Sequence, residues 1–137
     1  MTYVFDASFV GAIIIPDENN PRINKIQADI GEEEDIFVPQ LLWYEIASIF
    51  MNLIRRKRYT PDEVLQLIPL LAAVRLETDH KTGADYSQKL LRLCNEYNLS
   101  SYDAAYLELA ERTNAVLCTL DENLVAAAKK RGVTVLK

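Results

Sequence analysis

The feature that most constrains this chain is an alternation of short apolar runs with longer segments of helical pattern. Five runs are apolar over almost their whole length, at residues 3–6, 36–38, 74–77, 115–120 and 133–136. Helical patterns separate them, at residues 9–15, 21–30, 41–54, 82–97, 102–112 and 122–131. Short apolar strands that alternate with helices predict a parallel sheet covered on both faces, so the expected fold class is α/β with three α/β/α layers.

Residues that start and stop helices support this division. Pro39 is expected in the first turn of the helix that continues over residues 41–54, and Thr60 with Glu63 is typical of a helix cap. Gly132 follows the last helix, where glycine commonly closes a helix. Because residues 41–54 are apolar at most positions, they predict a helix that is buried on several sides.

Length and composition fit one domain that spans residues 1–137, and the hydrophobic fraction of 50% is ample for a core. A net charge of −5 excludes a broad basic surface that grips nucleic acid. The longest apolar run, residues 9–15, is far shorter than the ~18 residues of a membrane span, and the chain starts without a secretory pattern. We therefore expect a cytoplasmic protein without a membrane anchor, in which Cys94 and Cys118 are buried, reduced thiols.

Histidine and glycine usage excludes several kinds of active site. His80 is the only histidine, so neither a histidine-rich zinc site nor two-histidine ribonuclease chemistry can be built. It lies in a polar stretch without a nucleophile-elbow sequence, which predicts an exposed residue near a helix start. The four glycines are scattered and form neither a Walker loop nor a dinucleotide fingerprint. Acidic side chains remain as the candidates.

Four acidic residues fall at the expected ends of strands and starts of helices. Asp6 directly follows the first strand, Asp121 directly follows the fourth, and Asp103 begins the helix that leads into the fourth. Glu45 lies in the first turns of the helix after the second strand. The reactive crevice of an open parallel sheet lies beyond the carboxyl ends of its strands. All four carboxylates should converge there, provided that the first and fourth strands are neighbours.

Two simpler interpretations stay open beside this one. Aspartate is a common helix N-cap, so each of the three aspartates could serve only as a cap. Glu45 could belong to the solvent-facing stripe of an amphipathic helix, together with Ser48, Asn52 and Arg55. The joint placement argues for more, since four clustered carboxylates would repel one another unless protons or metal ions offset their charge.

Magnesium or manganese suits such a cluster. Hard divalent ions prefer oxygen ligands, and no histidine or thiolate is placed to attract zinc. The net charge of −5 is compatible with this, because the four acids account for most of the excess. An oxygen-only cluster without a histidine base suits metal-assisted hydrolysis with one or two ions.

Four blocks of the sequence resemble the signature blocks of PIN-domain ribonucleases, and most closely those of VapC-type toxins from toxin–antitoxin pairs. The blocks are Val4-Phe-Asp-Ala-Ser8, Glu45-Ile-Ala-Ser48, Ser101-Tyr-Asp-Ala-Ala-Tyr106 and Thr119-Leu-Asp-Glu-Asn-Leu124. They occur in order across nearly the whole chain, which makes the match specific although each block alone is weak.

The resemblance implies a five-stranded parallel sheet of order 3-2-1-4-5, which makes the first and fourth strands neighbours. It also implies that the metal site consists of Asp6, Glu45, Asp103 and Asp121. Ser8 and Thr119 would be polar support for that site. Asn123 stands near a place where relatives carry another acid, which leaves open whether a second ion is held. With the acidic cluster, the resemblance leads to the hypothesis of metal-assisted hydrolysis of RNA phosphodiester bonds, and cleavage is expected to leave a 5′-phosphate and a 3′-hydroxyl.

Two basic runs are candidates for RNA contact. The densest consists of Arg55, Arg56, Lys57 and Arg58, for which helix termination and RNA binding are equally good interpretations. The run 129–131 ends a helix, where cations meet the helix dipole favourably, and this role is the better interpretation.

The apolar helix also offers a candidate partner surface. Core packing is the default for Trp43, Tyr44, Phe50 and Met51. The alternatives are a homodimer, as the resemblance suggests, and an antitoxin segment that docks as an amphipathic helix.

Two other classes compete with the metal-dependent ribonuclease. A receiver-like signalling domain shares the length and alternation, but it would need paired acids after the first strand, where Asp6 is followed by Ala and Ser. A PIN scaffold that binds RNA or protein without cutting is the other.

Overall fold

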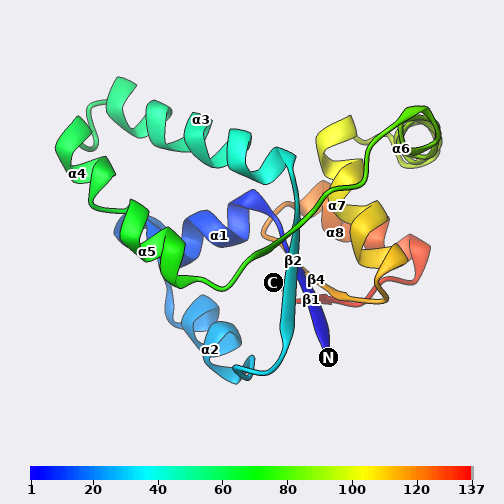
Figure 1. Cartoon of the computed structure of the whole chain (residues 1–137), viewed down its shortest axis with the longest axis horizontal. Helices are drawn as coiled ribbons and strands as arrows, with labels where there is room; N and C mark the ends of the chain where they lie inside the picture. The colour runs from blue at the N-terminus through cyan, green and yellow to red at the C-terminus, as the bar shows by residue number, and fades with distance from the viewer. Residues whose placement is uncertain (137) are drawn as a thin grey trace.

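The computed structural model, in which residues 1–136 are described, is built on a five-stranded parallel sheet (Figure 1). The strands are β1 (Thr2–Phe5), β2 (Asp35–Pro39), β3 (Glu77–Asp79), β4 (Val116–Cys118) and β5 (Val135–Leu136). Their order is β3-β2-β1-β4-β5, which confirms the expected α/β class and sheet order. A receiver-like domain would have the order 2-1-3-4-5, so that alternative is wrong.

Helices cover both faces of this sheet. Within residues 1–136 they are α1 (Ala7–Ile14), α2 (Pro21–Asp29), α3 (Leu41–Arg55), α4 (Pro61–Leu65), α5 (Ile68–Ala73), α6 (Ala84–Tyr97), α7 (Ser101–Arg112) and α8 (Glu122–Arg131), with a 3₁₀ turn at Pro16–Glu18. Figure 1 shows α1 to α5 on one side of the strands and α6 to α8 on the other. None of these helices is long and apolar enough to cross a membrane.

The central strand, β1, aligns the parts of the chain that matter for the site. Val4 pairs in register with Phe37 of β2 on one side and with Leu117 of β4 on the other. Val4, Phe5 and Leu117 are fully buried, as expected for strands that carry helices on both faces. The carboxyl ends of β1, β2 and β4 therefore lie at one edge, where α1, α3 and α8 begin.

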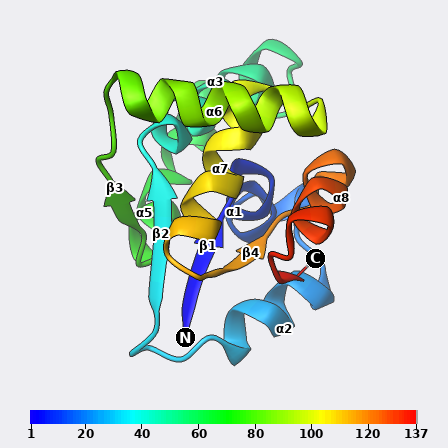
Figure 2. The same cartoon turned by 90° about the vertical axis from the view of Figure 1, so that its right-hand side faces the viewer.

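Helix α7 lies against the middle of the sheet (Figure 2). All its residues from Ala104 to Ala110 are buried. The small side chains of Ala104 and Ala105 let its backbone approach the strands closely, which brings the first turn of α7 to the same edge of the sheet.

Helix α3 is less buried than its composition predicted. One stripe, formed by Leu42, Ile46, Phe50 and Leu53, faces the core. Trp43, Tyr44 and Met51 are exposed, so the prediction of burial on several sides is wrong. The reason is positional, since only residues on one side of the helix meet the layer beneath, whatever the composition of the other side.

The third strand and the start of α3 differ from the sequence prediction. The third strand was expected at residues 74–77, but β3 is Glu77–Asp79, because pairing with β2 selects these polar residues at the sheet edge. Val74 and Leu76 pack against the core from the preceding loop. Pro39 ends β2 rather than opening α3, since the fixed φ of proline suits either position.

The remaining boundaries agree more closely. The capping box at Thr60 and Glu63 is present, and α8 is closed by Gly132 in the left-handed conformation. Strands β4 and β5 are shorter than the apolar runs that predicted them, and α5 was not predicted. Cys118 is a buried free thiol, and Cys94 is a free thiol that is only partly buried. Burial, together with the nearby charge of Asp6, raises the pKa of Cys118 to about 12.

Candidate active site

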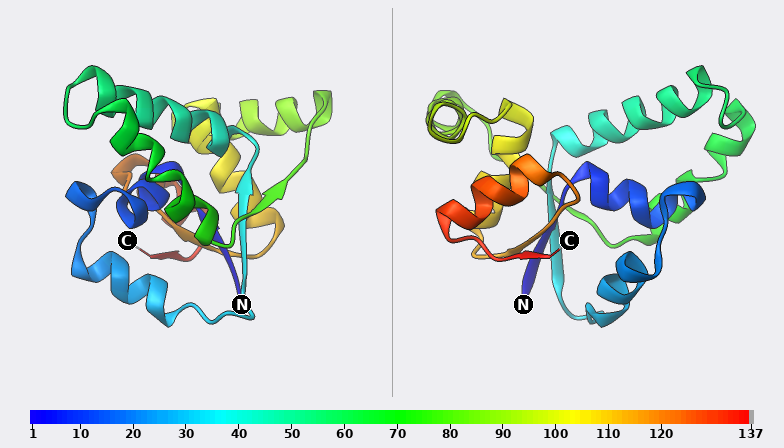
Figure 3. Two further views of the ribbon diagram at one scale, coloured as in Figure 1. Left: turned by 60° about the vertical axis from the view of Figure 1, so that its left-hand side comes forward. Right: turned by 180° about the vertical axis from the view of Figure 1, so that it is seen from behind.

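The four carboxylates expected from the sequence all lie near the starts of helices at the carboxyl edge of the sheet. Asp6 and Asp121 are the N-caps of α1 and α8, Asp103 lies in the first turn of α7, and Glu45 lies in the second turn of α3. Figure 3 shows the starts of these four helices gathered at one end of the strands. Residues far apart in the sequence are thus brought together by the sheet order.

Asp6 is the most constrained of the four side chains, with 4% of its surface exposed. Its Oδ1 accepts hydrogen bonds from the Ser8 hydroxyl at 2.7 Å and from the Phe9 amide at 2.9 Å. The Thr119 hydroxyl donates to Oδ2. A carboxylate has about four acceptor positions, so Asp6 is fixed in place and still has capacity for another partner.

The expected support residues join the two neighbouring strand ends. The Leu120 amide donates to the Ser8 hydroxyl at 3.0 Å, and the Asp121 amide donates to the Thr119 hydroxyl at 3.0 Å. Strand β4 ends at Cys118, and these hydrogen bonds hold the loop that carries Asp121 against Asp6.

Glu45 has a partner that the sequence analysis missed. The hydroxyl of Tyr106, a residue only 2% exposed on α7, donates to Glu45 Oε1 at 2.6 Å. Burial and the neighbouring Glu45 raise the pKa of Tyr106, so it stays a donor. Tyr106 lies three residues after Asp103 on one helix, and that spacing was the only local signal for its role.

Two of the three aspartates do cap helices, which leaves untouched whether capping is their only role. The side chains of Asp6 and Asp121 each accept a hydrogen bond from the third amide beyond them, as caps do. The cap of α7 is Ser100, whose hydroxyl accepts from the Asp103 amide at 3.1 Å. The Asp103 carboxylate is therefore not needed for capping, and its placement calls for another explanation.

The carboxylates influence one another electrostatically. Burial raises the pKa of Asp6, and the charge of Asp121 adds to this, while the three hydrogen bonds to Asp6 oppose it. Burial also raises the pKa of Asp103, with contributions from Asp121 and Asp6. The pKa of Glu45 is raised by burial, lowered by the hydrogen bond from Tyr106, and raised again by Asp6 and Asp103. The cluster thus concentrates negative charge that a cation would relieve.

The chemistry of this donor set fits a hard divalent ion. The side chains offer only carboxylate and hydroxyl oxygens, and the single histidine, His80, is bonded to Gln40. Across residues 1–136, no three His, Cys, Asp or Glu side chains form a ready group of metal ligands. Magnesium retains several waters and binds through one or two carboxylates, so its needs are compatible with this looser arrangement.

A hollow of about 480 Å³ adjoins Glu45, the one carboxylate of the four that lines it. Glu45, Ser48 and Asn52 line it from α3, and Tyr102 lines it from α7. The polar stripe of α3 therefore faces a cavity beside the cluster, at least as far as Asn52. Arg55, the next residue of the suspected solvent stripe, does not line it.

The basic run at the end of α3 is only partly available for RNA. Arg58 pairs with Asp17 at 3.1 Å and Glu18 at 3.7 Å, whereas Arg55 and Arg56 are exposed. Arg55 lies ten positions beyond Glu45, which is about 15 Å along the helix. In the second run, Arg131 pairs with Glu111, which supports the structural interpretation of residues 129–131.

Fold and site together define a three-layer α/β protein with an oxygen-rich acidic centre at the carboxyl edge of its sheet. A family model described as PIN domain matches residues 3–130. The chain belongs to the PIN domain family.

Known proteins that resemble the chain agree with this assignment. Ribonuclease VapC3 of Pyrobaculum aerophilum is 27% identical over 124 residues, which cover 90% of this chain and 92% of the relative. VapBC2 of Rickettsia felis, solved with a DNA fragment from its promoter, has a TM-score of 0.71 at 13% identity, covering 99% of this chain and 98% of that one. VapC20 of Mycobacterium tuberculosis, a sarcin-ricin loop cleaving toxin, has a TM-score of 0.66 at 15% identity, covering 91% and 94%.

Proposed function

We propose that this protein is an endoribonuclease that depends on Mg²⁺ or Mn²⁺ and acts as the toxin of a toxin–antitoxin pair. The observation that carries the proposal is the placement of four carboxylates near the starts of four helices at one edge of the sheet, in a site that offers only oxygen ligands and in which Asp6 accepts three hydrogen bonds. The ribonuclease name of the VapC3 relative supports the reaction.

Asp6, Glu45, Asp103 and Asp121 are the proposed ligands of the ion. A bound divalent ion would supply an activated water and stabilise the leaving oxygen of the phosphodiester. Ser8, Thr119 and the Phe9 amide hold Asp6 in one orientation, and the Tyr106 hydroxyl holds Glu45. Asp6 and Glu45 are thus already oriented before an ion binds, so little further ordering of these side chains is needed.

The proposed partners follow from the same likeness. A structural neighbour from Klebsiella pneumoniae is a toxin–antitoxin complex, which supports an antitoxin as a partner of this chain. Exposed Trp43 and Met51 are a candidate homodimer surface on α3. Arg55 and Arg56 remain candidates for contact with RNA phosphates. A cytoplasmic location agrees with cleavage of cellular RNA.

Replacement of Asp6 by Asn tests the function directly. We expect Asp6→Asn to reduce Mg²⁺- or Mn²⁺-dependent cleavage of RNA by about a thousandfold or more, because it removes the most constrained ligand. Asp35→Asn is the matched control, since it removes the same charge at the exposed amino end of β2 and should cut normally. Products should carry 5′-phosphate ends, and EDTA should abolish their formation.

The same assay distinguishes the nuclease from a non-cutting PIN scaffold. A scaffold would bind RNA with or without Mn²⁺ and leave it intact. Equal cleavage by the wild type and Asp6→Asn would contradict the proposed site.

A further inference from the structure

Two exposed tyrosines stand directly beside the proposed metal ligands. Tyr44 is 78% exposed on α3 and precedes Glu45, while Tyr102 is 61% exposed on α7 and precedes Asp103. Both rings are thus presented to solvent from two different helices next to the carboxylate cluster. Neither the fold nor the proposed metal site requires an exposed aromatic side chain at these positions.

The two tyrosines stand where two hollows adjoin. The first is the hollow of about 480 Å³ that Glu45, Ser48 and Asn52 line. The second, of about 370 Å³, extends toward Lys81 in the loop before α6. Tyr44 and Tyr102 line both hollows, so a flexible polymer could pass from one to the other across the two rings.

The charges of the hollows differ in a way that selects different parts of a nucleotide. The first hollow has one carboxylate, Glu45, and no cation in its lining, so it disfavours a phosphate. A neutral base suits it, since Ser48 and Asn52 can donate to and accept from the edge of a base. In the second hollow Lys81 is the only cationic side chain of the lining, and the Asp79 carboxylate there is neutralised by Arg112.

We propose that Tyr44 and Tyr102 form a stacking site for an unpaired base of single-stranded RNA, with the adjoining phosphate near Lys81. This inference rests on the proposed function and names the side chains that would hold the RNA beside the proposed metal site. Stacking on aromatic side chains is the common way in which proteins hold unpaired bases, and it tolerates any base. A base held here would leave its own backbone close to Glu45 and Asp103.

A second copy of the chain is the competing occupant of this face. The spacing of residues along α3 distinguishes a surface for RNA from a surface for a second copy. Tyr44 shares its side of α3 with Ser48 and Asn52, at spacings of four and eight residues. Trp43, Ala47 and Met51 follow the same spacing on a different side, which is the better dimer surface.

The test measures binding of a fluorescein-labelled single-stranded RNA of about ten nucleotides by anisotropy, in EDTA so that no cleavage occurs. We expect Tyr44→Ala and Tyr102→Ala each to weaken binding by about 5- to 150-fold, which corresponds to about 1–3 kcal/mol of stacking. Tyr44→Phe and Tyr102→Phe should bind within about twofold of the wild type, because the ring is kept. Leu65→Ala, at an exposed position of α4 that lines neither hollow, is the control and should bind normally.

Two further probes sharpen the assignment. An RNA with abasic nucleotides should bind the wild type as weakly as the intact RNA binds the alanine variants, and a duplex of the same sequence should lose the dependence on tyrosine. Lys81→Ala should reduce the slope of affinity against salt by about one charge.

The outcomes separate this inference from the proposed function. Alanine variants that bind the RNA like the wild type would overturn the stacking site, even if the wild type cuts RNA with Mg²⁺. Dissociation of a dimer by Tyr44→Ala, seen by light scattering, would assign the face to a second copy and also overturn it. Tyrosine-dependent binding without any cleavage in Mg²⁺ or Mn²⁺ would support the stacking site and refute the nuclease.

Discussion

At the scale of single residues, the site reuses groups that the fold already needs. Asp6 caps α1 through the Phe9 amide and is the most constrained carboxylate of the cluster. Thr119 is fully buried, and its hydroxyl donates to Asp6 while accepting from the Asp121 amide. The two hydrogen bonds make one hydroxyl the link between the ends of β1 and β4. Capping and site formation are therefore one arrangement rather than competing interpretations.

Tyr106→Phe tests whether the buried phenol positions Glu45. We expect the variant to lose about 1–2 kcal/mol of unfolding free energy in urea, because a partly buried carboxylate loses its donor. Its affinity for Mn²⁺, measured by isothermal titration calorimetry, should also fall. Tyr3→Phe is the control, since Tyr3 is buried in β1 and its hydroxyl lies near Met1 and Glu34, away from the carboxylate cluster. Unchanged Mn²⁺ affinity in Tyr106→Phe would show that the phenol acts on stability alone.

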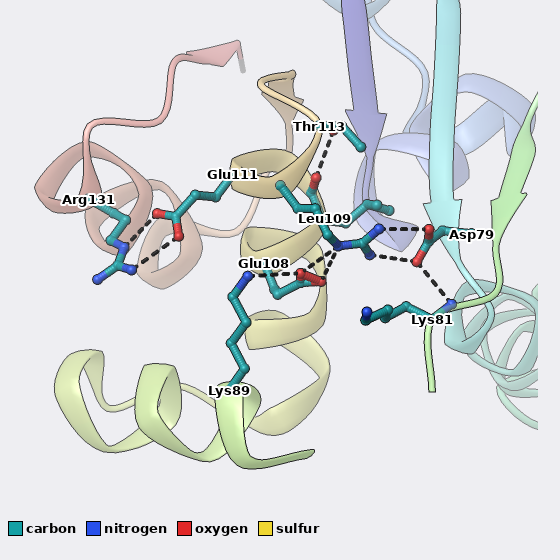
Figure 4. A network of polar contacts seen from close by, with 9 residues as sticks. Asp79, Lys81, Lys89, Glu108, Leu109, Glu111, Thr113 and Arg131 are labelled. Atoms are coloured by element: carbon teal, nitrogen blue, oxygen red, sulfur yellow. Dashed lines mark hydrogen bonds and ion pairs between the residues drawn. The ribbon is translucent and has the colours of Figure 1, made fainter. Parts of the chain in front are cut away.

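At the scale of elements, α7 is held at both of its ends. Its first turns carry Asp103 and Tyr106, and its last turns carry a polar network that Figure 4 shows around Glu108. Glu108 is 1% exposed and pairs with Arg112 at 2.9 Å and with Lys89 of α6 at 3.6 Å. Arg112 also donates twice to Asp79 at the end of β3. These contacts at the C-terminal end of α7 restrain the rotation of the helix about its axis, and the orientation of Asp103 in its first turn depends on that rotation.

Arg112→Ala should therefore be costly. It leaves the Glu108 carboxylate buried with Lys89 as its remaining cationic partner, and we expect a loss of about 3 kcal/mol in urea unfolding. Arg131→Ala is the control, because its pair with Glu111 is about one-third exposed and should be worth less than about 1 kcal/mol. The double variant Glu108→Met with Arg112→Met should recover much of the loss. Equal losses for the two alanine variants would contradict the importance of burial.

These elements also show where the sequence was informative. The helix caps at Thr60 and Gly132 were predictable because capping is decided within a few neighbouring residues. The position of β3 was not, since hydrogen bonds to β2 select Glu77–Asp79 over the more apolar residues before it. The burial of Glu108 could not be predicted from the sequence either. Its partner Lys89 comes from α6, and its other partner, Arg112, is held by Asp79 of β3.

At the scale of the whole molecule, the sheet order makes the site. Because β4 lies beside β1, Asp121 lies close to Asp6, although the two residues are 115 positions apart in the sequence. Local patterns predicted that each acid would follow a strand or begin a helix. They did not determine which strands are neighbours, and the order came from the resemblance to a known family. Tyr106 ends the third block of the resemblance, but its role was not predicted, because its hydrogen bond to Glu45 joins residues of two different helices.

The convergence of the four carboxylates should make folding stability depend on pH and on divalent ions. The folded-state pKa values of Asp6, Glu45 and Asp103 are raised, so their contribution to stability is greatest in acid and is lost as the pH rises through those values. At neutral pH in EDTA, Asp6→Asn should therefore melt at the same temperature as the wild type or higher, and that advantage should vanish near pH 4.

Mn²⁺ at about a hundred times its dissociation constant should stabilise the wild type by about 2.7 kcal/mol, which is roughly a 10 °C rise in melting temperature. Asp6→Asn should lose most of this rise, whereas the control Asp35→Asn should keep it, with ionic strength matched by KCl. Because this measurement needs no substrate, it tests the carboxylate cluster independently of RNA cleavage. A rise that persists in full in Asp6→Asn would mean that the ion binds elsewhere, and the four helix starts would then have converged for packing alone.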